Sequence, residues 1–233
     1  GNTILEIQGL SKEIQGVDVL NGLTLTLRKG DKIAFVGKDS LAKTTLFQVL
    51  AGEMEPDSGS FRWGSTITSA YFPKDNGSYF RNDMNLIDWI CQFPPCDSES
   101  FARSFLGRML FSGDEATKKV SVLSGGEQVR CMLARIMLTE ANVLMFDEPT
   151  NHLDLESLTA LNNGLIAFPE VLLFASCDHK LVSTVANRIV EITPDGIIDR
   201  IMGYDEYLEN CDMDRIANEG GARRPMLNVT KAA

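Results

Sequence analysis

Two segments near the start of the chain alternate apolar and polar side chains. Residues 4–10 read ILEIQGL and residues 23–31 read LTLTLRKGD. Successive side chains of a strand point to opposite faces, so this pattern predicts two half-buried strands. Residues 60–73 predict two further short strands, and residues 188–199 predict a hairpin near the end of the chain.

Three continuous apolar runs predict strands that are buried on both faces. They lie within residues 32–37, 142–149 and 170–176. Between the strands, apolar residues at helical spacing predict a helix from Thr44 to about Leu50 and a mainly helical stretch over residues 84–140. This order predicts an α/β core that is interrupted by a helical insert and then resumes.

Composition suits one large domain, or a domain with a small subdomain. The chain has 233 residues, of which 44% are hydrophobic, and this is ample material for a core. A formal charge of −10 argues against a protein that mainly grips nucleic acid, because phosphate backbones attract Lys and Arg. No apolar run reaches the ~20 residues of a membrane helix. The first residues do not have the pattern of a secretion signal. The chain begins without Met, which suggests a piece of a longer protein.

The cysteines indicate an intracellular, cytoplasmic protein. The chain has five of them, an odd number with no regular framework, which is typical of reduced thiols. Cys91 and Cys96 have the spacing of half a metal site. No second pair exists and the two histidines are far away in the sequence, so we do not expect zinc.

Residues 36–45, VGKDSLAKTT, lie between a predicted buried strand and a predicted helix, as a phosphate-binding loop does. In such a loop backbone N–H groups surround the phosphates, and the helix N-terminus favours anions. Lys43 would bridge the β- and γ-phosphates, and Thr44 would ligate Mg²⁺. On the loop alone, an ordinary strand–turn–helix with a surface lysine is about as good an interpretation. The candidate nucleotide-binding residues are Gly37, Lys38, Asp39, Ser40, Leu41, Ala42, Lys43, Thr44 and Thr45.

Two later stretches strengthen the nucleotide interpretation. Residues 122–130, VLSGGEQVR, join a small-residue turn to a helix, and the buried strand that follows ends at Asp147 and Glu148. Asp147 can hold Mg²⁺, usually through a water, and Glu148 can polarise an attacking water as a general base. Taken alone, residues 147–154 could also be a capped loop. Three such motifs in this order make a chance match implausible.

These motifs resemble the ATP-binding-cassette (ABC) proteins over about residues 3–208. The family's signature sequence matches residues 123–128, LSGGEQ, its Walker B strand matches residues 143–148, and its D-loop matches residues 153–154. The resemblance implies an α/β cassette with a RecA-like mixed-sheet core, an antiparallel β subdomain and a helical subdomain. It also implies that the chain binds ATP and Mg²⁺.

The resemblance predicts how the chain is divided. Residues 3–76 and 141–208 would form the ATP-binding α/β core with the antiparallel β subdomain. Residues 77–140 would form the helical subdomain that carries the signature motif. The chain turns polar after Leu208, and we expect residues 209–233 to be a flexible C-terminal tail.

One short segment indicates which ABC subfamily the chain resembles. Residues 147–154 read DEPTNHLD, which resembles the ABC-F proteins, whereas transport cassettes commonly read DEPTSALD. Residues 30–37 and 203–209 are similar to the second cassette of such two-cassette proteins. The resemblance implies a protein without a membrane domain that acts on the ribosome and tRNA, as a translation factor or an antibiotic-resistance protein. Only the family resemblance implies the ribosome; composition and motif spacing do not.

In the family, two cassettes pair head to tail around two ATP molecules. The implied partner is a second cassette, either in the same parent chain or in a homodimer. Ser124 and Gly126 would then face the γ-phosphate that the other cassette holds, with the helix N-terminus aimed at it. The resemblance therefore adds Ser124, Gly125, Gly126 and Glu127 to the nucleotide-binding residues.

Several family positions carry other residue types in this chain. Ser40 and Ala42 replace glycines, at a cost of ~1–2 kcal/mol each wherever the loop needs positive φ. Lys74 stands at the Q-loop glutamine position, where it cannot ligate Mg²⁺ while charged but can meet a phosphate. Cys177 occupies the switch-histidine position, and a thiol is a weak donor without positive charge. Because Glu148 is retained, we expect slow hydrolysis, with Glu148, Cys177 and Lys74 at the catalytic positions.

Two other function classes compete with this one. The first is the ATPase subunit of a membrane transporter. Asn151, His152 and Lys74 count against it, because transporter cassettes use the Q-loop region to dock a membrane domain. The second is a nucleotide-binding interaction module without useful turnover, which Ala42, Lys74 and Cys177 favour because each departs from the family pattern. His179, two residues after the switch position, is expected to be a surface histidine.

Overall fold

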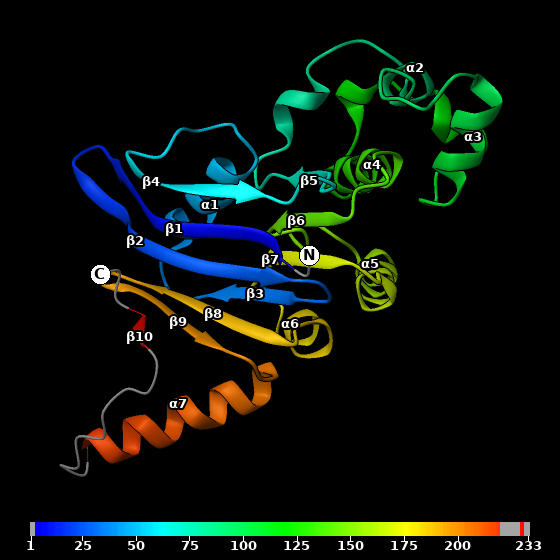
Figure 1. Ribbon diagram of the computed structural model, residues 1–233. Coiled ribbons are helices and arrows are strands. Elements are labelled where there is room, and N and C mark those ends of the chain that lie inside the picture. The colour runs from blue at the N-terminus through cyan, green and yellow to red at the C-terminus, as the bar shows by residue number, and fades with distance from the viewer. Residues whose placement is uncertain (1–2, 220–228, 231–233) are drawn as a thin grey trace.

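A seven-stranded sheet forms the centre of the computed structural model, which describes residues 3–219 and 229–230 (Figure 1). Its strands are β3 (Lys32–Val36), β5 (Ser69–Phe72), β6 (Val143–Asp147), β7 (Val171–Ala175), β8 (Arg188–Thr193), β9 (Gly196–Arg200) and β10 (Val229–Thr230). They lie in the order β10-β9-β8-β3-β7-β6-β5. The five strands from β8 to β5 run parallel, and β9 and β10 add an antiparallel edge. The expected terminal hairpin is the β8–β9 pair.

A second, antiparallel sheet contains β1 (Thr3–Ile14), β2 (Val17–Arg28) and β4 (Ser58–Trp63), in the order β2-β1-β4. The first two strands are longer than the alternating segments that predicted them. They are joined by Gln15 and Gly16, whose φ angles of 52° and 79° are typical of a two-residue hairpin loop. This sheet lies over the seven-stranded sheet in Figure 1.

Helix α1 (Ser40–Leu50) lies between the two sheets and fills the core that they share. Leu46 and Phe47 are fully buried there, and the ring of Phe47 meets that of Phe35 edge-on at a centroid distance of 5.5 Å. The helix begins at Ser40, four residues before the predicted start at Thr44. It does so because Asp39 is its N-cap, whose side chain accepts a hydrogen bond from the backbone N–H of Ala42.

The opposite face of the seven-stranded sheet is covered by helices. They are α4 (Gly125–Leu138), α5 (Leu155–Ala167) and α6 (His179–Val185), with the smaller α2 (Leu86–Ile90) and α3 (Glu99–Gly107) beyond α4 (Figure 1). Short 3-10 helices span Gly77–Phe80, Gly113–Thr117 and Val120–Val122. Successive side chains of a strand pack alternately into the two cores. In β7, Leu173 packs on the α1 side, and its neighbours Leu172 and Phe174 pack on the α4 side.

Helix α7 (Tyr204–Glu219) occupies the first part of the segment that the sequence predicted to be a flexible tail from residue 209. Tyr207 anchors it, because this side chain is buried and its hydroxyl donates a hydrogen bond to the Glu191 carboxylate on β8. Acidic residues in its first turn also suit a helix N-terminus. Further along, β10 pairs with β9, and the rest of the predicted tail, residues 220–228 and 231–233, lies outside the described residues.

The predicted α/β fold class is therefore confirmed, with a mixed parallel and antiparallel sheet, a separate antiparallel sheet and a helical part. Among residues 3–219 and 229–230, no helix combines the length and the apolar character that crossing a bilayer requires. The carboxyl ends of β3, β6 and β7 lie at one edge of the sheet, and ligands of open α/β sheets bind at such an edge.

Candidate nucleotide-binding site

The chain leaves β3 through a tight turn at Gly37. Its φ of 117° is a conformation that side chains rarely adopt, and a Cβ placed there would lie 3.2 Å from the carbonyl oxygen of Ile192. Glycine is therefore required at this position. Ser40 and Ala42 are different, because both lie in α1 and neither has positive φ. The cost of ~1–2 kcal/mol that positive φ would bring at these two positions therefore does not arise.

Lys43 and Thr45 are polar residues in the first turns of α1, directly after this loop. The Lys43 side chain is buried, and its Nζ donates to the carbonyl oxygen of Gly37 at 3.1 Å, so the ammonium lies across the turn. Thr45 is fully buried, and its Oγ1 finds no hydrogen-bond partner within the described part of the chain. Buried hydroxyls are normally paired. The Lys43 ammonium lies across the turn, where it can meet a phosphate, and the unpaired Thr45 hydroxyl is close to it in α1, so the start of this helix fits a nucleotide.

Asp39, one of the candidate nucleotide-binding residues, places a negative charge at the same loop. Its Oδ1 accepts the backbone N–H of Ala42 at 3.1 Å and so takes one of the free donors at the start of α1. A phosphate would seek these same donors. The signal was present in the sequence, because Asp directly before a helix is a common N-cap.

Thr44 and Asp147 meet at the position expected for the metal ion. The Thr44 hydroxyl donates to Oδ2 of Asp147 at 2.5 Å, which joins the first turn of α1 to the end of β6. Asp147 is almost fully buried, and burial raises its pKa, while the hydrogen bond from Thr44 and the charge of Lys74 act in the opposite direction. Mg²⁺ is often held by one or two protein oxygens together with substrate phosphates and waters. These two oxygens fit such an ion.

Glu148 adopts a strained backbone conformation directly after β6. Its φ is 50°, and its N–H donates to the carbonyl oxygen of Ala175 at 2.8 Å, which ties it to the end of β7. Its carboxylate is held by Cys177, which donates its backbone N–H to Oε2 at 3.1 Å and its thiol to Oε1 at 3.4 Å. The charge and the hydrogen bond of Glu148 raise the pKa of the Cys177 thiol, with a smaller contribution from burial.

Lys74 belongs to the same neighbourhood. It follows β5, is exposed, and lines a cavity of about 700 Å³ together with Thr44, Asn151 and His152. Its charge also acts on Asp147 and Cys177. His179 behaves differently: its Nε2 lies 3.1 Å from Oδ1 of Asp205 on α7, and its side chain is 60% exposed. It is the surface histidine that the sequence predicted.

The signature segment begins α4 with a capping box. The Ser124 backbone N–H donates to Oε2 of Glu127 at 2.8 Å, and the Glu127 N–H donates to Ser124 Oγ at 3.3 Å. Lys118 Nζ donates to the second Glu127 oxygen at 2.8 Å. Burial alone would raise the pKa of Glu127, but the hydrogen bonds from Lys118 and Ser124 outweigh it and lower this pKa. The box fixes the start of the helix, whose N-terminus is exposed.

Gly125 and Gly126 are glycines because His152 of the same chain packs against them. A Cβ on Gly125 would lie 3.2 Å from His152 Cβ, and one on Gly126 would lie 2.9 Å from the His152 carbonyl oxygen. His152 itself has a φ of 68°. The signature segment therefore touches the DEPTNHLD segment within one chain, a contact that sequence spacing alone did not reveal.

The chain is similar in sequence to several curated bacterial proteins. It is 59% identical over 221 residues to YkpA of Bacillus subtilis (strain 168), described as an uncharacterized ABC transporter ATP-binding protein, covering 94% of this chain and 41% of that protein. It is 40% identical to the probable ATP-binding protein YbiT of Escherichia coli O157:H7, covering 88% and 39%. It is 30% identical to the energy-dependent translational throttle protein EttA of Escherichia coli (strain K12), covering 89% and 39%. The chain thus spans about two fifths of the length of these relatives.

Solved structures share the fold. CbiO1 from Clostridium perfringens, part of the ABC transporter complex cbiONQ, aligns with a TM-score of 0.67 at 18% identity and covers 94% of this chain and 96% of that chain. A putative metal-chelate type ABC transporter aligns with a TM-score of 0.69 at 19% identity, covering 94% and 90%. Residues 20–151, more than half of the chain, match the ABC transporter family. With the phosphate loop, the Thr44–Asp147 contact and the signature helix in place, this chain belongs to that family, as an ATP-binding cassette.

Proposed function

We propose that this chain is the second cassette of an ABC-F-type protein that acts on the ribosome in the cytoplasm and hydrolyses ATP slowly. The ATP-binding part of this statement follows from the family. The assignment to the ABC-F type is carried by the DEPTNHLD segment, whose His152 packs on the signature glycines. The similarity to EttA, whose name describes a translational throttle protein, supports the proposed action on the ribosome.

The proposed roles follow from the geometry. Bound MgATP supplies the phosphoryl group to be transferred and the charge that stabilises it. Lys43 and the loop N–H groups would hold the phosphates, and Thr44 with Asp147 would hold the metal ion. Glu148 would take a proton from an attacking water, because a carboxylate has free lone pairs beyond the two that Cys177 occupies.

A complete site would need a second cassette. Ser124 and Gly126 lie at the exposed N-terminus of α4, where they are free to meet nucleotide held by another cassette, in the parent chain or in a homodimer. We propose that residues 3–76 and 141–208 act as the nucleotide-binding core and that residues 77–140 carry the signature to the partner. The parent protein's contacts with ribosome and tRNA are part of the proposal.

Two other functions have specific support. A transporter ATPase subunit is favoured by the names of the structural relatives, although these share only the fold at 18–19% identity. An interaction module without useful turnover is favoured by Cys177, whose thiol is directed to Glu148. Turnover of the parent protein distinguishes the module from an ATPase.

Ribosome co-sedimentation of the parent protein tests the proposal against the transporter. Glu148→Gln should trap the ATP-bound state, because binding is kept while the base is lost, so the variant should sediment with ribosomes in MgATP. The double variant with Lys43→Ala is the matched control and should stay in the supernatant. Recovery of the Glu148→Gln protein with membranes, and none with ribosomes, would refute the ribosomal part while leaving ATP binding intact.

A further inference from the structure

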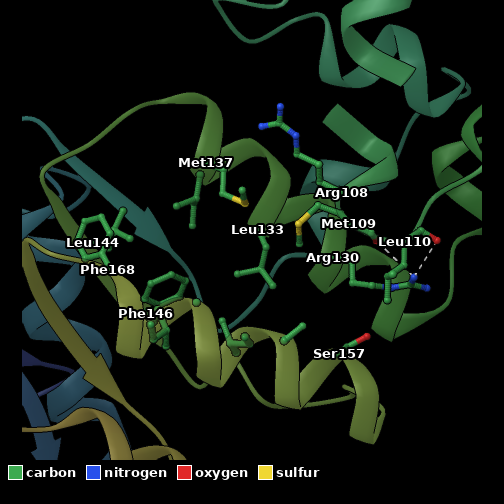
Figure 2. Close-up of a pocket in the computed structure, with 15 residues that line it drawn as sticks. Arg108, Met109, Leu110, Arg130, Leu133, Met137, Leu144, Phe146, Ser157 and Phe168 are labelled. Carbon is green, nitrogen blue, oxygen red and sulfur yellow. Dashed lines mark hydrogen bonds between the residues drawn. The ribbon is translucent and has the colours of Figure 1, made fainter. Parts of the chain in front are cut away.

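An apolar cavity of about 390 Å³ lies between α4 and α5 (Figure 2). Two polar residues in its wall, Ser157 and Arg130, both face the Asp154 carboxylate at the N-cap of α5. Ser157 hydrogen-bonds to this carboxylate, and its negative charge meets that of the guanidinium. These groups therefore give no reason to expect a ligand. A pair of cysteines in the helical part is different, because neither the cores nor the nucleotide site uses its chemistry.

Cys91 and Cys96 lie close together at the connection between α2 and α3. Cys91 is the C-cap of α2, and Cys96 lies two residues before Ser98, the N-cap of α3. The two thiols lie 3.8 and 3.9 Å from the same acceptor, the carbonyl oxygen of Ser98, and they hydrogen-bond to each other. Thiols in this arrangement need only small side-chain movements to form an S–S bond. Both are free and half-buried, so a small molecule in solution can reach them.

The loop between the two cysteines supports the signature helix. The ring of Phe93 in this loop meets that of Trp89 on α2 edge-on, at a centroid distance of 5.1 Å. The guanidinium of Arg135 lies over the Phe93 ring, 4.7 Å from its centroid, and Arg135 belongs to α4. A bond between the cysteines would fasten the end of α2 to the start of α3 and brace the loop on which α4 packs.

We propose that Cys91 and Cys96 are a redox modification site, which a small-molecule disulfide such as oxidised glutathione converts from a dithiol to an internal disulfide. One cysteine thiolate attacks a sulfur of oxidised glutathione and releases one glutathione. The second thiolate attacks the resulting mixed disulfide and releases the other. The protein loses two electrons and two protons, which the two released glutathione molecules carry. The proposal does not depend on ribosome binding.

The surroundings of the thiols set the order of the two attacks. Burial raises the pKa of the Cys91 thiol to about 12, with further contributions from the hydrogen bond and the charge of Cys96. The thiolate is the nucleophile, so Cys96 attacks first. Once the Cys96 sulfur is bonded to glutathione, it no longer presents a thiol or a charge to Cys91. The pKa of Cys91 then falls, and its thiolate closes the internal bond.

Mass spectrometry of the 233-residue chain can detect this bond, because trypsin leaves both cysteines in one peptide. Cleavage at Arg81 and Arg103 releases residues 82–103. The folded chain is equilibrated with a glutathione redox buffer at pH 8, quenched with acid, unfolded, alkylated and digested. The oxidised peptide should be lighter than the dithiol peptide by two hydrogen atoms and take up no alkyl label. Cys211 is exposed, and its own glutathione adduct reports the oxidising strength of the buffer.

The same peptide gives the results that would overturn the proposal. One is a peptide that stays a dithiol, or carries glutathione without an internal bond, while Cys211 is glutathionylated. The other comes from the urea-unfolded chain, the matched control, which keeps the sequence spacing and loses the shared position at Ser98. The ratio of disulfide to dithiol should be several-fold higher in the folded chain. Equal ratios would show that the fold does not bring these thiols together.

Single variants separate the two attacks. Cys91→Ser keeps Cys96 and should accumulate its glutathione adduct, which the wild type resolves. Cys96→Ser should form an adduct several-fold more slowly, because burial still raises the pKa of Cys91. A faster reaction of Cys96→Ser would overturn this order. The bridged wild type should melt a few degrees above the reduced wild type, whereas Cys96→Ser should melt equally in both buffers. An unchanged melting temperature of the bridged wild type would overturn the bracing of the α2–α3 loop.

Discussion

Cys177 contacts both carboxylate oxygens of Glu148, one through its backbone N–H at 3.1 Å and the other through its thiol at 3.4 Å. A thiol has one proton to donate. While that proton is directed at Glu148, it is not available to a phosphate in the same site. Cys177 therefore acts on the proposed base as a positioning residue, and the donor that the family's switch histidine would supply to the γ-phosphate is missing.

Replacing Cys177 by His should raise kcat and change ATP affinity little. A preorganised donor at developing charge is typically worth ~10²–10³ in rate, and Glu148 cannot act as this donor because it is an anion. The assay must use the paired cassettes of the parent protein, since a single cassette lacks half of each site.

The same substitution in a Glu148→Gln background is the control, where the gain should disappear with the base. An unchanged kcat for Cys177→His with Glu148 present would contradict the account. It would mean that Lys74 supplies the donor or that a step other than chemistry limits turnover.

The Cys177 thiol should react slowly with alkylating agents in the native protein. Glu148 is the main reason that its pKa is raised, so at pH 8 less of it is thiolate than of an ordinary cysteine. Glu148→Gln removes that charge, lowers the pKa, and should speed alkylation by iodoacetamide several-fold. Mass spectrometry can follow Cys177 with Cys211 on α7 as the internal control. Equal rates in both proteins would show that the carboxylate does not control the thiol.

Asp39→Asn should strengthen MgATP binding. The Asp39 carboxylate occupies a donor at the start of α1 and brings negative charge to a loop that must accept phosphates. Asparagine keeps the N-cap hydrogen bond without the charge. Calorimetry should show a lower Kd for the variant at low ionic strength, with a smaller difference at high salt. A higher Kd would mean that the carboxylate contributes to binding.

Removing Arg188 from β8 should destabilise the fold. It is buried, and it forms a two-pronged ion pair with Asp199 at 2.8 and 2.6 Å and a contact with Asp31 at 2.7 Å. Arg188→Leu leaves these carboxylates without their cation and should lower the free energy of unfolding by about 3–5 kcal/mol in urea. Arg103→Leu, which breaks only an exposed pair with Glu99, should cost about 0.3–0.5 kcal/mol. A similar loss of unfolding free energy in both variants would show that the buried ion pairs of Arg188 do not stabilise the fold.

Sequence pattern predicted an α/β core and its main strands, because the alternation in β1 and the apolar runs of β3, β6 and β7 are local consequences of burial. It also placed Asp147 and Glu148 at a strand end. The sequence pattern could not predict contacts between segments that are far apart in the chain. The packing of His152 on Gly126 and the thiol contact of Cys177 depend on how the elements meet, and only the structure brings them together. Helix α7 was missed because its polar composition hides the few aromatic anchors that dock it.

Calorimetric titration of this chain with MgATP tests the central claim most directly. Lys43 is the buried ammonium that lies across the turn at Gly37, so Lys43→Ala should remove most of the affinity that the wild type shows. Lys29→Ala, at an exposed lysine outside the loop, should bind as the wild type does. Loss of binding in Lys43→Ala alone is the predicted result, and affinity equal to that of the wild type in Lys43→Ala would show that the loop at Gly37–Thr45 is not the nucleotide site.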